Sequence, residues 1–129
     1  MRDVSDPPLT IKGWLRYDVV VRLLAQIDDV DSVLEVGAGE GALSVRLARR
    51  YRYVGVEPDA RAWAAARRRF DEAGVGSIVH GGVEALPPHT SFDLVCAFEV
   101  LEHCADDVAV LRDWAARLRP RGWLLCPGK

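Results

Sequence analysis

Cysteine is scarce in this sequence, and long apolar runs are absent. The three cysteines, Cys96, Cys104 and Cys126, are odd in number and form no CxxC pair. This usage argues against a disulfide framework and against a zinc site, so we expect no bound metal. The longest apolar run, residues 94–98, is far shorter than the ~18 residues of a membrane span. The first residues lack the apolar stretch of a signal peptide, so we expect a cytoplasmic protein without membrane contact.

An excess of charge of one sign is also lacking. Seventeen Lys and Arg residues face nineteen Asp and Glu residues, which gives a formal net charge of −2. A chain this close to neutrality has no general basic field to attract a polyanion, so we expect no nucleic-acid partner. Of the 129 residues, 50% are hydrophobic and 28% charged. Because an average domain has roughly 150 residues, the sequence predicts a single folded domain over residues 1–129.

Apolar residues alternate along the chain between the spacing of helices and that of strands. Helical spacing marks residues 14–27, 40–50, 59–73 and 106–118. Short aliphatic runs mark strands at residues 32–36, 53–57, 77–80, 92–98 and 122–126. Asp59 is a suitable N-cap for the third helix, and Gly74 a suitable end. Strands that alternate with helices predict a doubly wound α/β fold, a mostly parallel sheet with helices on both faces.

A cluster of glycines follows the first predicted strand. Gly37, Gly39 and Gly41 occupy alternate positions, which lets the backbone turn sharply and approach a bound molecule. In a doubly wound sheet, ligands bind beyond the carboxyl ends of the strands, where this turn lies. A merely structural turn from strand to helix usually needs one glycine. The cluster therefore indicates a turn that binds a small molecule and not a purely structural turn.

The charge around this turn bears on the kind of ligand. Residues 37–42 fit the loose GxGxxA pattern of dinucleotide-binding turns, a weak signal by itself. Glu35 and Glu40, however, are carboxylates that would repel a phosphate and suit a cationic group such as an ammonium. Glu57 ends the second predicted strand, where a carboxylate can accept both hydroxyl hydrogens of a ribose. The alternative for Glu57 is a charge that stabilises the N-terminus of the next helix.

Three consecutive arginines, Arg67, Arg68 and Arg69, lie on the predicted helix 59–73. Such a run can contact a phosphate or an acidic partner. A solvated helix face is the more common explanation, and it is the one we favour.

Four segments of the chain together resemble the class I S-adenosylmethionine-dependent methyltransferases. They are residues 33–41, 54–59, 92–103 and 118–122, and the likeness extends over residues 32–126. The segment Phe-Glu-Val-Leu-Glu-His at residues 98–103 resembles especially the sequences of the small-molecule branch, which is related to the ubiquinone-biosynthesis enzymes. Four motifs in the right order are more specific than any single one, so the resemblance implies a Rossmann-like fold and S-adenosylmethionine as cofactor.

The resemblance also implies roles for single residues. The residues implied to surround the methionine part of the cofactor are Glu35, Gly37, Ala38, Gly39 and Gly41. Glu57 would hold the ribose hydroxyls and Pro58 would lie against the adenine. Val83 would offer its backbone N–H and side chain to the adenine, and Phe98 and Glu99 would border the cofactor through their backbone. His103 is the candidate catalytic base.

Two positions depart from the pattern of the relatives. In the stretch 81–87, Gly82 stands where relatives commonly have an aspartate that contacts the adenine amino group. Loss of such a hydrogen bond to a charged acceptor lowers affinity by roughly tenfold to a hundredfold. Arg121 replaces a glycine of the usual Pro-Gly-Gly turn, a surface change that we expect to be harmless.

The relatives continue after the fifth strand into two more strands, which this sequence lacks. We therefore expect a domain truncated at its C-terminus, in which the strand at 122–126 is an unpaired edge. Trp123, Leu124 and Leu125 are apolar, and an apolar edge invites pairing with another chain, so a homodimer is one expectation.

The expected reaction is methyl transfer from S-adenosylmethionine to a small-molecule acceptor by in-line displacement. Such a displacement needs chiefly alignment and desolvation, plus a base such as His103 if the acceptor holds a proton. Two alternatives stay open. In the first, the chain is a cofactor-binding fragment without activity of its own. In the second, it is an NAD-binding domain, which the glycine spacing permits.

Overall fold

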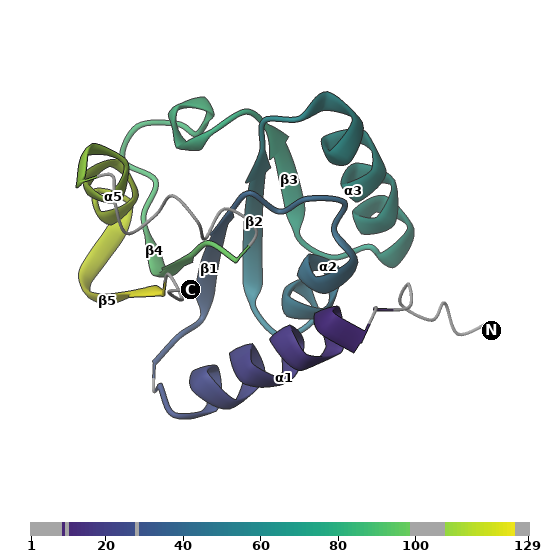
Figure 1. The fold of residues 1–129 in the computed structure, drawn as a ribbon. Coiled ribbons are helices and arrows are strands. Elements are labelled where there is room, and N and C mark those ends of the chain that lie inside the picture. The colour runs from purple at the N-terminus through teal and green to yellow at the C-terminus, as the bar shows by residue number, and fades with distance from the viewer. Residues whose placement is uncertain (1–8, 10, 28, 99–107, 126–129) are drawn as a thin grey trace.

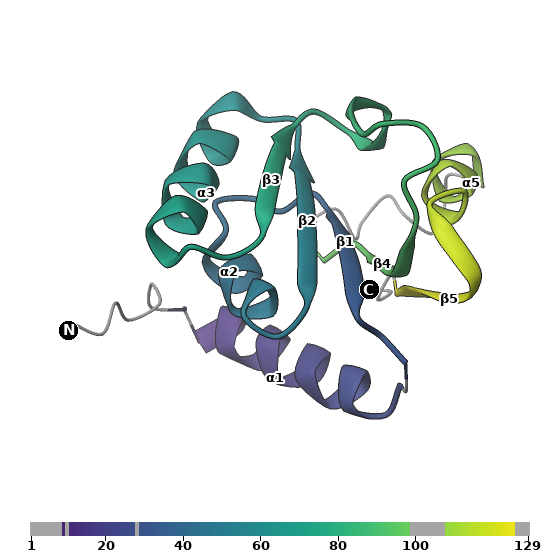
Figure 2. The same cartoon turned by 180° about the vertical axis from the view of Figure 1, so that it is seen from behind.

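The computed structural model describes residues 9, 11–27, 29–98 and 108–125, which form one α/β layer structure (Figure 1). The helices are α1 (Ile11–Ala25), α2 (Ala42–Ala48), α3 (Ala60–Ala73), the 3-10 turn η1 (Val83–Ala85) and α5 (Val108–Ala115). The strands are β1 (Ser32–Val36), β2 (Arg52–Glu57), β3 (Ser77–His80), β4 (Phe92–Cys96) and β5 (Leu118–Leu125). All neighbouring strands run parallel in the order β3-β2-β1-β4-β5, which Figure 2 shows from behind. The predicted doubly wound parallel sheet is confirmed.

Local sequence signals account for several element boundaries. The strands β1 and β3 have the predicted bounds. The helix α3 begins after Asp59, whose carboxylate accepts a hydrogen bond of 2.8 Å from the N–H of Ala62. It ends at Gly74, which adopts the left-handed conformation (φ 67°) that terminates helices. These elements are determined by residues close to them in the chain.

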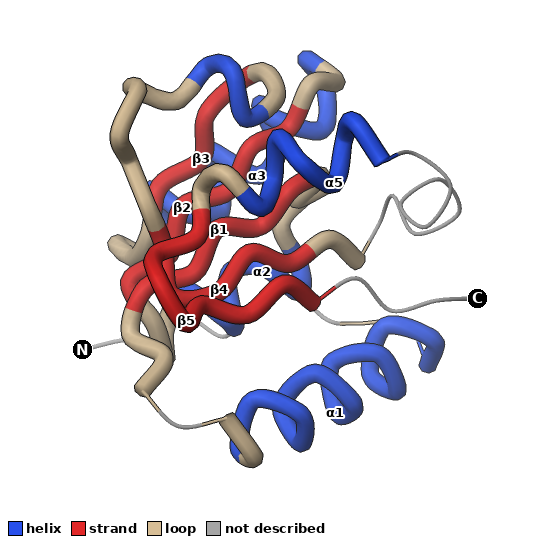
Figure 3. The backbone as a smooth tube through the Cα atoms, turned by 90° about the vertical axis from the view of Figure 1, so that its left-hand side faces the viewer, coloured by secondary structure: helices blue, strands red, loops and turns tan. Residues whose placement is uncertain are grey.

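Helices cover both faces of the sheet, and each face has its own core. On one face α1, α2 and α3 pack on alternate side chains of the strands, with Val33, Leu94 and Phe70 among the buried residues. On the other face α5 and the loop with η1 pack on the remaining side chains, and Trp114 is buried there. In Figure 3, where β5 is nearest the viewer, α5 lies above the sheet and α1 below it. The central strands β1 and β4 are therefore enclosed on both sides, as continuous apolar strands require.

The last crossover differs from the prediction. The helix expected over residues 106–118 ends at Ala115 in the described part, and β5 already begins at Leu118. Leu118 pairs with Phe92 and Trp123 with Leu94, so residues 119–122 form an irregularity in the strand pairing. Pro120 lies in this irregular stretch, where a proline is accommodated because edge strands and bulges tolerate the missing N–H.

The strand β5 ends the sheet on one side. Its side chains Trp123 and Leu124 remain 52% and 36% exposed. This is the apolar edge that the sequence predicts, and the homodimer expected to cover it stays a prediction.

Within the described ranges, none of the helices has the length and apolar character needed to cross a bilayer. In the same ranges, no three His, Cys, Asp or Glu side chains are grouped so that they could hold a metal ion.

Candidate cofactor-binding site

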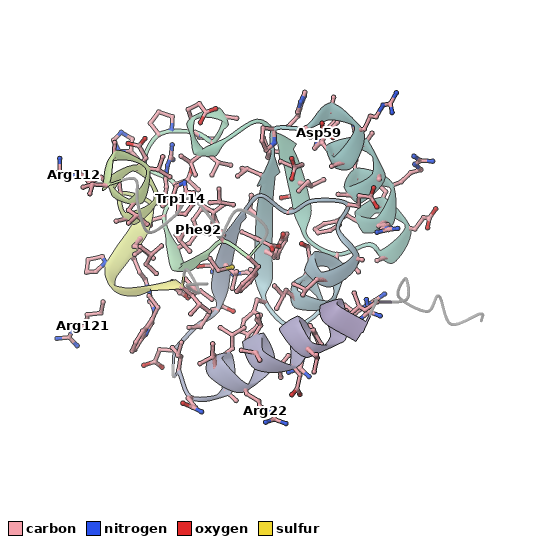
Figure 4. All side chains as sticks on the ribbon, in the orientation of Figure 1. Arg22, Asp59, Phe92, Arg112, Trp114 and Arg121 are labelled. Carbon is pink, nitrogen blue, oxygen red and sulfur yellow. The ribbon has the colours of Figure 1, made fainter. Side chains whose placement is uncertain are left out.

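The loops that follow β1, β2 and β3 meet at one end of the sheet, because the three strands are parallel neighbours. In Figure 1, β2 and β3 end at the top of the molecule, where α3 begins and the loop toward η1 departs. Asp59, labelled in Figure 4, marks this end. The glycine turn (residues 37–41), Glu57 and the loop at 81–86 thus form a continuous carboxyl-end surface.

The glycine turn adopts a conformation that favours glycine at three positions. The φ angles of Gly37, Gly39 and Gly41 are 76°, 63° and 86°. The N–H groups of Gly37 and Ala38 both point back toward β2, where they donate to the carbonyl of Val56 at 2.9 and 3.1 Å. The first half of the turn is therefore fixed to the neighbouring strand.

Glu57 fixes the second half of the turn. The residue is only 7% exposed. Oε1 accepts a hydrogen bond of 2.7 Å from the N–H of Gly39, and Oε2 accepts one of 2.8 Å from the N–H of Asp59. Because each carboxylate oxygen has two lone pairs, both can still accept a ligand hydroxyl. Glu57 thus bridges the turn and the start of α3, and its expected contact with the ribose hydroxyls stays a prediction.

These contacts bear on the choice between a phosphate and a cationic ligand. The N–H groups of Gly37, Ala38 and Gly39 donate within the protein, so this part of the turn offers none of the donors that hold a pyrophosphate. The carboxylates of Glu40 and Glu57 add negative charge to the same surface. Both features disfavour a phosphate bridge and favour a ligand with a positive group.

Gly41 is required by helix packing as well as by the turn. A Cβ at this position would lie 3.0 Å from the Cβ and 3.1 Å from the Cα of Ala66 on α3, closer than side chains normally approach. The glycine therefore lets α3 pack against the beginning of α2. Its expected place beside the cofactor stays a prediction.

Glu35 lies inside the protein, below the turn, with 1% of its surface exposed. Its Oε1 accepts hydrogen bonds from the hydroxyl of Ser44 and, at 2.5 Å, from the hydroxyl of Tyr53. Gly55 makes room for this contact, since a Cβ there would lie 2.6 Å from the Tyr53 hydroxyl oxygen. Ser44 also lies 3.3 Å from the carbonyl oxygen of Ala38 in the turn. The structure thus shows Glu35 supporting the turn from beneath, while its contact with a ligand stays a prediction.

Two neighbours of Glu35 are held in their neutral forms. Burial raises the pKa of the Tyr53 hydroxyl well above its usual value, and the charge of Glu35 raises it further. Burial, followed by the charge of Glu35, likewise raises the pKa of the Cys96 thiol. Tyr53 therefore remains a hydrogen-bond donor to the carboxylate over the whole physiological pH range.

Arg69 contacts the glycine turn, which the sequence did not indicate. Its guanidinium donates a hydrogen bond of 3.0 Å to the carbonyl of Glu40 in the glycine turn. Arg67 instead lies over the Trp63 ring, 5.4 Å from its centroid, and pairs with Asp71 at 3.9 Å. Arg67 and Arg68 are exposed, as expected of a solvated helix face, whereas Arg69 contacts the turn. No local sequence signal connects Arg69 with Glu40, because the two residues are 29 positions apart.

Pro58 is exposed at the end of β2, and its carbonyl is held by a neighbouring strand. The Nε2–H of His80 donates to the Pro58 oxygen at 3.1 Å. The His80 ring also stacks on Trp63, with centroids 5.2 Å apart. His80, which has no obvious role in the sequence, thus positions the residue that the resemblance places against adenine.

The loop after β3 is attached to its surroundings on two sides. The N–H of Gly81 donates to the carbonyl of Glu57 at 2.9 Å. The Arg117 guanidinium donates to the carbonyls of Val83, at 3.0 Å, and Pro87, at 2.7 Å. The Val83 side chain is 9% exposed and packs in the core under α5. Val83 is therefore fixed at the carboxyl end, with its expected adenine contact still a prediction.

Phe98 follows β4 and its side chain is buried in the core shared by α1 and α2. Its expected contribution to the site through its backbone stays a prediction. Glu99 and His103 lie outside the described residues, so their expected roles stay predictions.

The fold and this carboxyl-end surface define a doubly wound α/β protein with a turn suited to a small, partly cationic ligand. A family model described as a methyltransferase domain matches residues 34–126. The chain belongs to this methyltransferase domain family.

Two relatives and one solved structure illustrate the similarity. A ubiquinone biosynthesis O-methyltransferase from Paramagnetospirillum magneticum is 37% identical over 93 residues, which are 70% of this chain and 37% of that protein. A probable S-adenosylmethionine-dependent methyltransferase from Mycolicibacterium smegmatis is 35% identical over 117 residues, 87% of this chain and 44% of that protein. Among solved structures, the chain is similar to a crystal structure of a coclaurine N-methyltransferase with bound N-methylheliamine and SAH. The match covers 96% of this chain and 38% of the N-methyltransferase chain, with a TM-score of 0.73 and 21% sequence identity. The chain thus spans less than half the length of these proteins.

Proposed function

We propose that this chain binds S-adenosylmethionine at the carboxyl-end surface and takes part in methyl transfer to a small-molecule acceptor. The glycine turn at 37–41 would receive the amino-acid part of the cofactor and Glu57 the ribose hydroxyls. Pro58 and Val83 would border the adenine. The positively charged methyl sulfonium then supplies a methyl group that the acceptor takes by in-line displacement.

One observation carries this proposal, the position of the Glu57 carboxylate. It is almost fully buried and fixed by two backbone N–H groups. No basic side chain among the described residues is paired with it. A fixed carboxylate without a counter-charge is a strong acceptor for a diol. The inward N–H groups of residues 37–39 add a reason to prefer a sulfonium nucleoside to NAD.

The residues present suit the cofactor in charge and in shape. The turn brings its backbone to the carboxyl end without side chains at Gly37 and Gly39, so a ligand can approach closely. One relative is a ubiquinone biosynthesis O-methyltransferase and the other a probable S-adenosylmethionine-dependent methyltransferase, which supports the same cofactor class. Phe98 and Glu99 through their backbone, and His103 as a base for an acceptor that holds a proton, complete the proposed site.

Calorimetric titration of the purified chain with S-adenosylhomocysteine and, separately, with NAD tests the cofactor. We expect a saturable heat of binding with S-adenosylhomocysteine and none with NAD at the same concentration. Equal binding of NAD would overturn the proposal in favour of a dinucleotide site.

Turnover is a separate question, because the chain is shorter than its relatives. Incubation with methyl-labelled S-adenosylmethionine and a panel of small phenols and amines tests for transfer of the label. We expect transfer to at least one acceptor. Binding without any transfer would favour a cofactor-binding part that does no chemistry alone.

We also propose that the edge of β5 pairs with a second copy of the chain. Trp123 and Leu124 are exposed there, and the outer side of β5 has no strand partner in the described sheet. Unpaired apolar edges promote such association. Light scattering should show a dimer that the substitution Trp123→Lys converts to a monomer. A monomer at high concentration before substitution contradicts this proposal.

A further inference from the structure

Three elements meet at one buried carboxylate oxygen beneath the glycine turn. Oε1 of Glu35, on β1, accepts hydrogen bonds from the hydroxyl of Tyr53 on β2, at 2.5 Å, and from the hydroxyl of Ser44 on α2. All three residues are buried, since Glu35 and Ser44 are 1% exposed and Tyr53 is 3% exposed. The two hydroxyls therefore fix the position of this oxygen from two neighbouring elements.

Ser44 connects this oxygen to the turn itself. Its Oγ also lies 3.3 Å from the carbonyl oxygen of Ala38, in the first half of the turn. A serine hydroxyl has a single hydrogen, so it can be donated fully to only one of these two acceptors. Because Tyr53 supplies a second donor to Glu35, the carboxylate does not depend on the Ser44 hydrogen alone. The Tyr53 hydroxyl thus affects how firmly Ser44 holds the Ala38 carbonyl, although Tyr53 belongs to β2 and not to the turn.

The surroundings of Tyr53 hold its side chain in one orientation. Its ring packs against Phe70 of α3, with the ring centroids 5.3 Å apart. A Cβ at Gly55 would lie 2.6 Å from the hydroxyl oxygen, so only a glycine at that position leaves space for it. Burial, followed by the charge of Glu35, raises the pKa of the hydroxyl well above its usual value. The hydroxyl therefore remains a donor that is directed at Glu35.

We propose that Tyr53 is a positioning residue for the amino-acid part of the cofactor. Through Glu35 and Ser44, its hydroxyl holds the turn at Ala38 in the conformation that receives this part. The inference rests on the proposed binding of S-adenosylmethionine. It adds a residue on β2 that determines how well the turn distinguishes a ligand that has the amino-acid part from one that lacks it.

The experiment compares two probes, S-adenosylhomocysteine and 5′-methylthioadenosine, which has the same nucleoside and sulfur but lacks the amino-acid part. The unchanged chain should bind S-adenosylhomocysteine more tightly. Tyr53→Phe keeps the ring and removes only the hydroxyl. It should weaken binding of S-adenosylhomocysteine about threefold to tenfold, the range for one hydrogen bond, and change the affinity for methylthioadenosine by less than about twofold. A general loss of structure weakens both alike, so the ratio of the two affinities isolates the positioning effect.

Two further variants complete the experiment. Tyr51→Phe is the matched control, because Tyr51 is a half-buried tyrosine that precedes β2 and packs against the same core. It should leave both affinities unchanged. Ser44→Ala removes the other donor to Glu35 together with the contact to Ala38, so it tests the same network from α2. It should lower the ratio of affinities at least as much as Tyr53→Phe does, and circular dichroism confirms that each variant is folded.

Four results would overturn the inference. The first is that Tyr53→Phe and Ser44→Ala keep the ratio of affinities of the unchanged chain. The second is an equal loss of both affinities, which indicates a purely structural role for the hydroxyls. The third is an unchanged chain that binds both probes equally, because the turn then does not recognise the amino-acid part. The fourth is an unchanged chain that binds neither probe, and this result alone also overturns the proposed function.

Discussion

Each end of the sheet has a buried carboxylate that accepts two backbone N–H groups, but the charge around the carboxylate differs between the two ends. At the carboxyl end, the Glu57 carboxylate accepts the N–H groups of Gly39 and Asp59. At the amino end, Oδ2 of Asp93 accepts the N–H groups of Asp31, at 2.7 Å, and Ser32, at 3.0 Å. Both residues are 7% exposed, and each carboxylate ties a loop to a strand.

The difference lies in the counter-charge. The Arg119 guanidinium forms an ion pair with Oδ1 of Asp93 and donates to the carbonyl of Asp29 at 2.6 Å. Burial raises the pKa of Asp93, but hydrogen bonds from Ser32 and Asp31 and the charge of Arg119 outweigh burial, so the pKa lies below its usual value. Glu57 has no such partner in the part of the chain that the structure describes.

A buried carboxylate that is paired with a guanidinium is a structural element, whereas one without a counter-charge keeps capacity for a ligand. Glu57 and Asp93 both lie in strands and are equally exposed, so the pairing of the charge distinguishes the proposed binding end from the opposite end of the sheet.

The largest expected effect comes from Glu57→Gln. The amide nitrogen faces either the Gly39 or the Asp59 N–H, and one ribose hydroxyl loses a charged acceptor. We expect affinity for S-adenosylhomocysteine to fall about a hundredfold, and the free energy of unfolding to fall by roughly 1–2 kcal/mol. Calorimetry and urea denaturation measure the two effects. An affinity within threefold of the unchanged chain would remove Glu57 from the site.

Asp93→Asn should show the opposite pattern. The amide cannot accept at both positions, so either the backbone donors of Asp31 and Ser32 or the Arg119 guanidinium lose their partner. The free energy of unfolding should fall by about 2 kcal/mol. Affinity for S-adenosylhomocysteine should stay within twofold, because the change is at the far end of the sheet. A large loss of affinity in a folded variant would erase the contrast between the two ends.

The pH dependence sharpens this contrast. The pKa of Asp93 is lower in the folded chain than in the unfolded chain, so its stabilisation is fully present above the unfolded value of about 3.9. It is lost as the pH falls through the lower, folded value. The difference in unfolding free energy between the unchanged chain and Asp93→Asn should therefore be constant near neutral pH and shrink in acid. A difference that grows in acid contradicts this assignment.

The sequence predicts those features that depend on neighbours in the chain. The alternation of strands and helices, the Asp59 cap and the Gly74 end are local signals, and the structure confirms them. The glycine turn was predicted for the same reason, and Gly37 and Gly39 adopt the left-handed backbone that glycine permits.

Contacts between distant residues were not predictable in this way. Tyr53 is 18 residues from Glu35, and Arg69 is 29 residues from Glu40, so no local pattern connects them. The start of β5 depends on its pairing with Phe92, which only the assembled sheet determines. Burial of Glu35 was likewise missed, because its charge alone suggested a ligand contact and its hydroxyl partners lie on other elements.

Arg121 offers a smaller effect at the structural end. It has a φ of 67°, although we expected this replacement of a glycine to be harmless. Figure 4 shows the side chain pointing away from the sheet at the middle of β5. Arg121→Gly relieves ~1–2 kcal/mol of backbone strain and loses ~0.5–1 kcal/mol through the more flexible unfolded chain, so we expect a net gain of about 0.5–1 kcal/mol. Arg121→Ala should give no gain in urea denaturation, which separates the backbone effect from loss of the side chain.

The smallest expected effect tests whether the binding end depends on contacts beyond Glu57. Arg69→Gln removes the donor to the Glu40 carbonyl, which is an exposed contact. The glycine turn keeps its bonds to Val56 and Glu57, so we expect affinity for S-adenosylhomocysteine to fall by only about twofold to threefold. Arg68→Gln removes the same charge from the adjacent exposed position and should leave the affinity unchanged. Equal losses in both variants would show that Arg69 acts through its charge and not through the turn carbonyl.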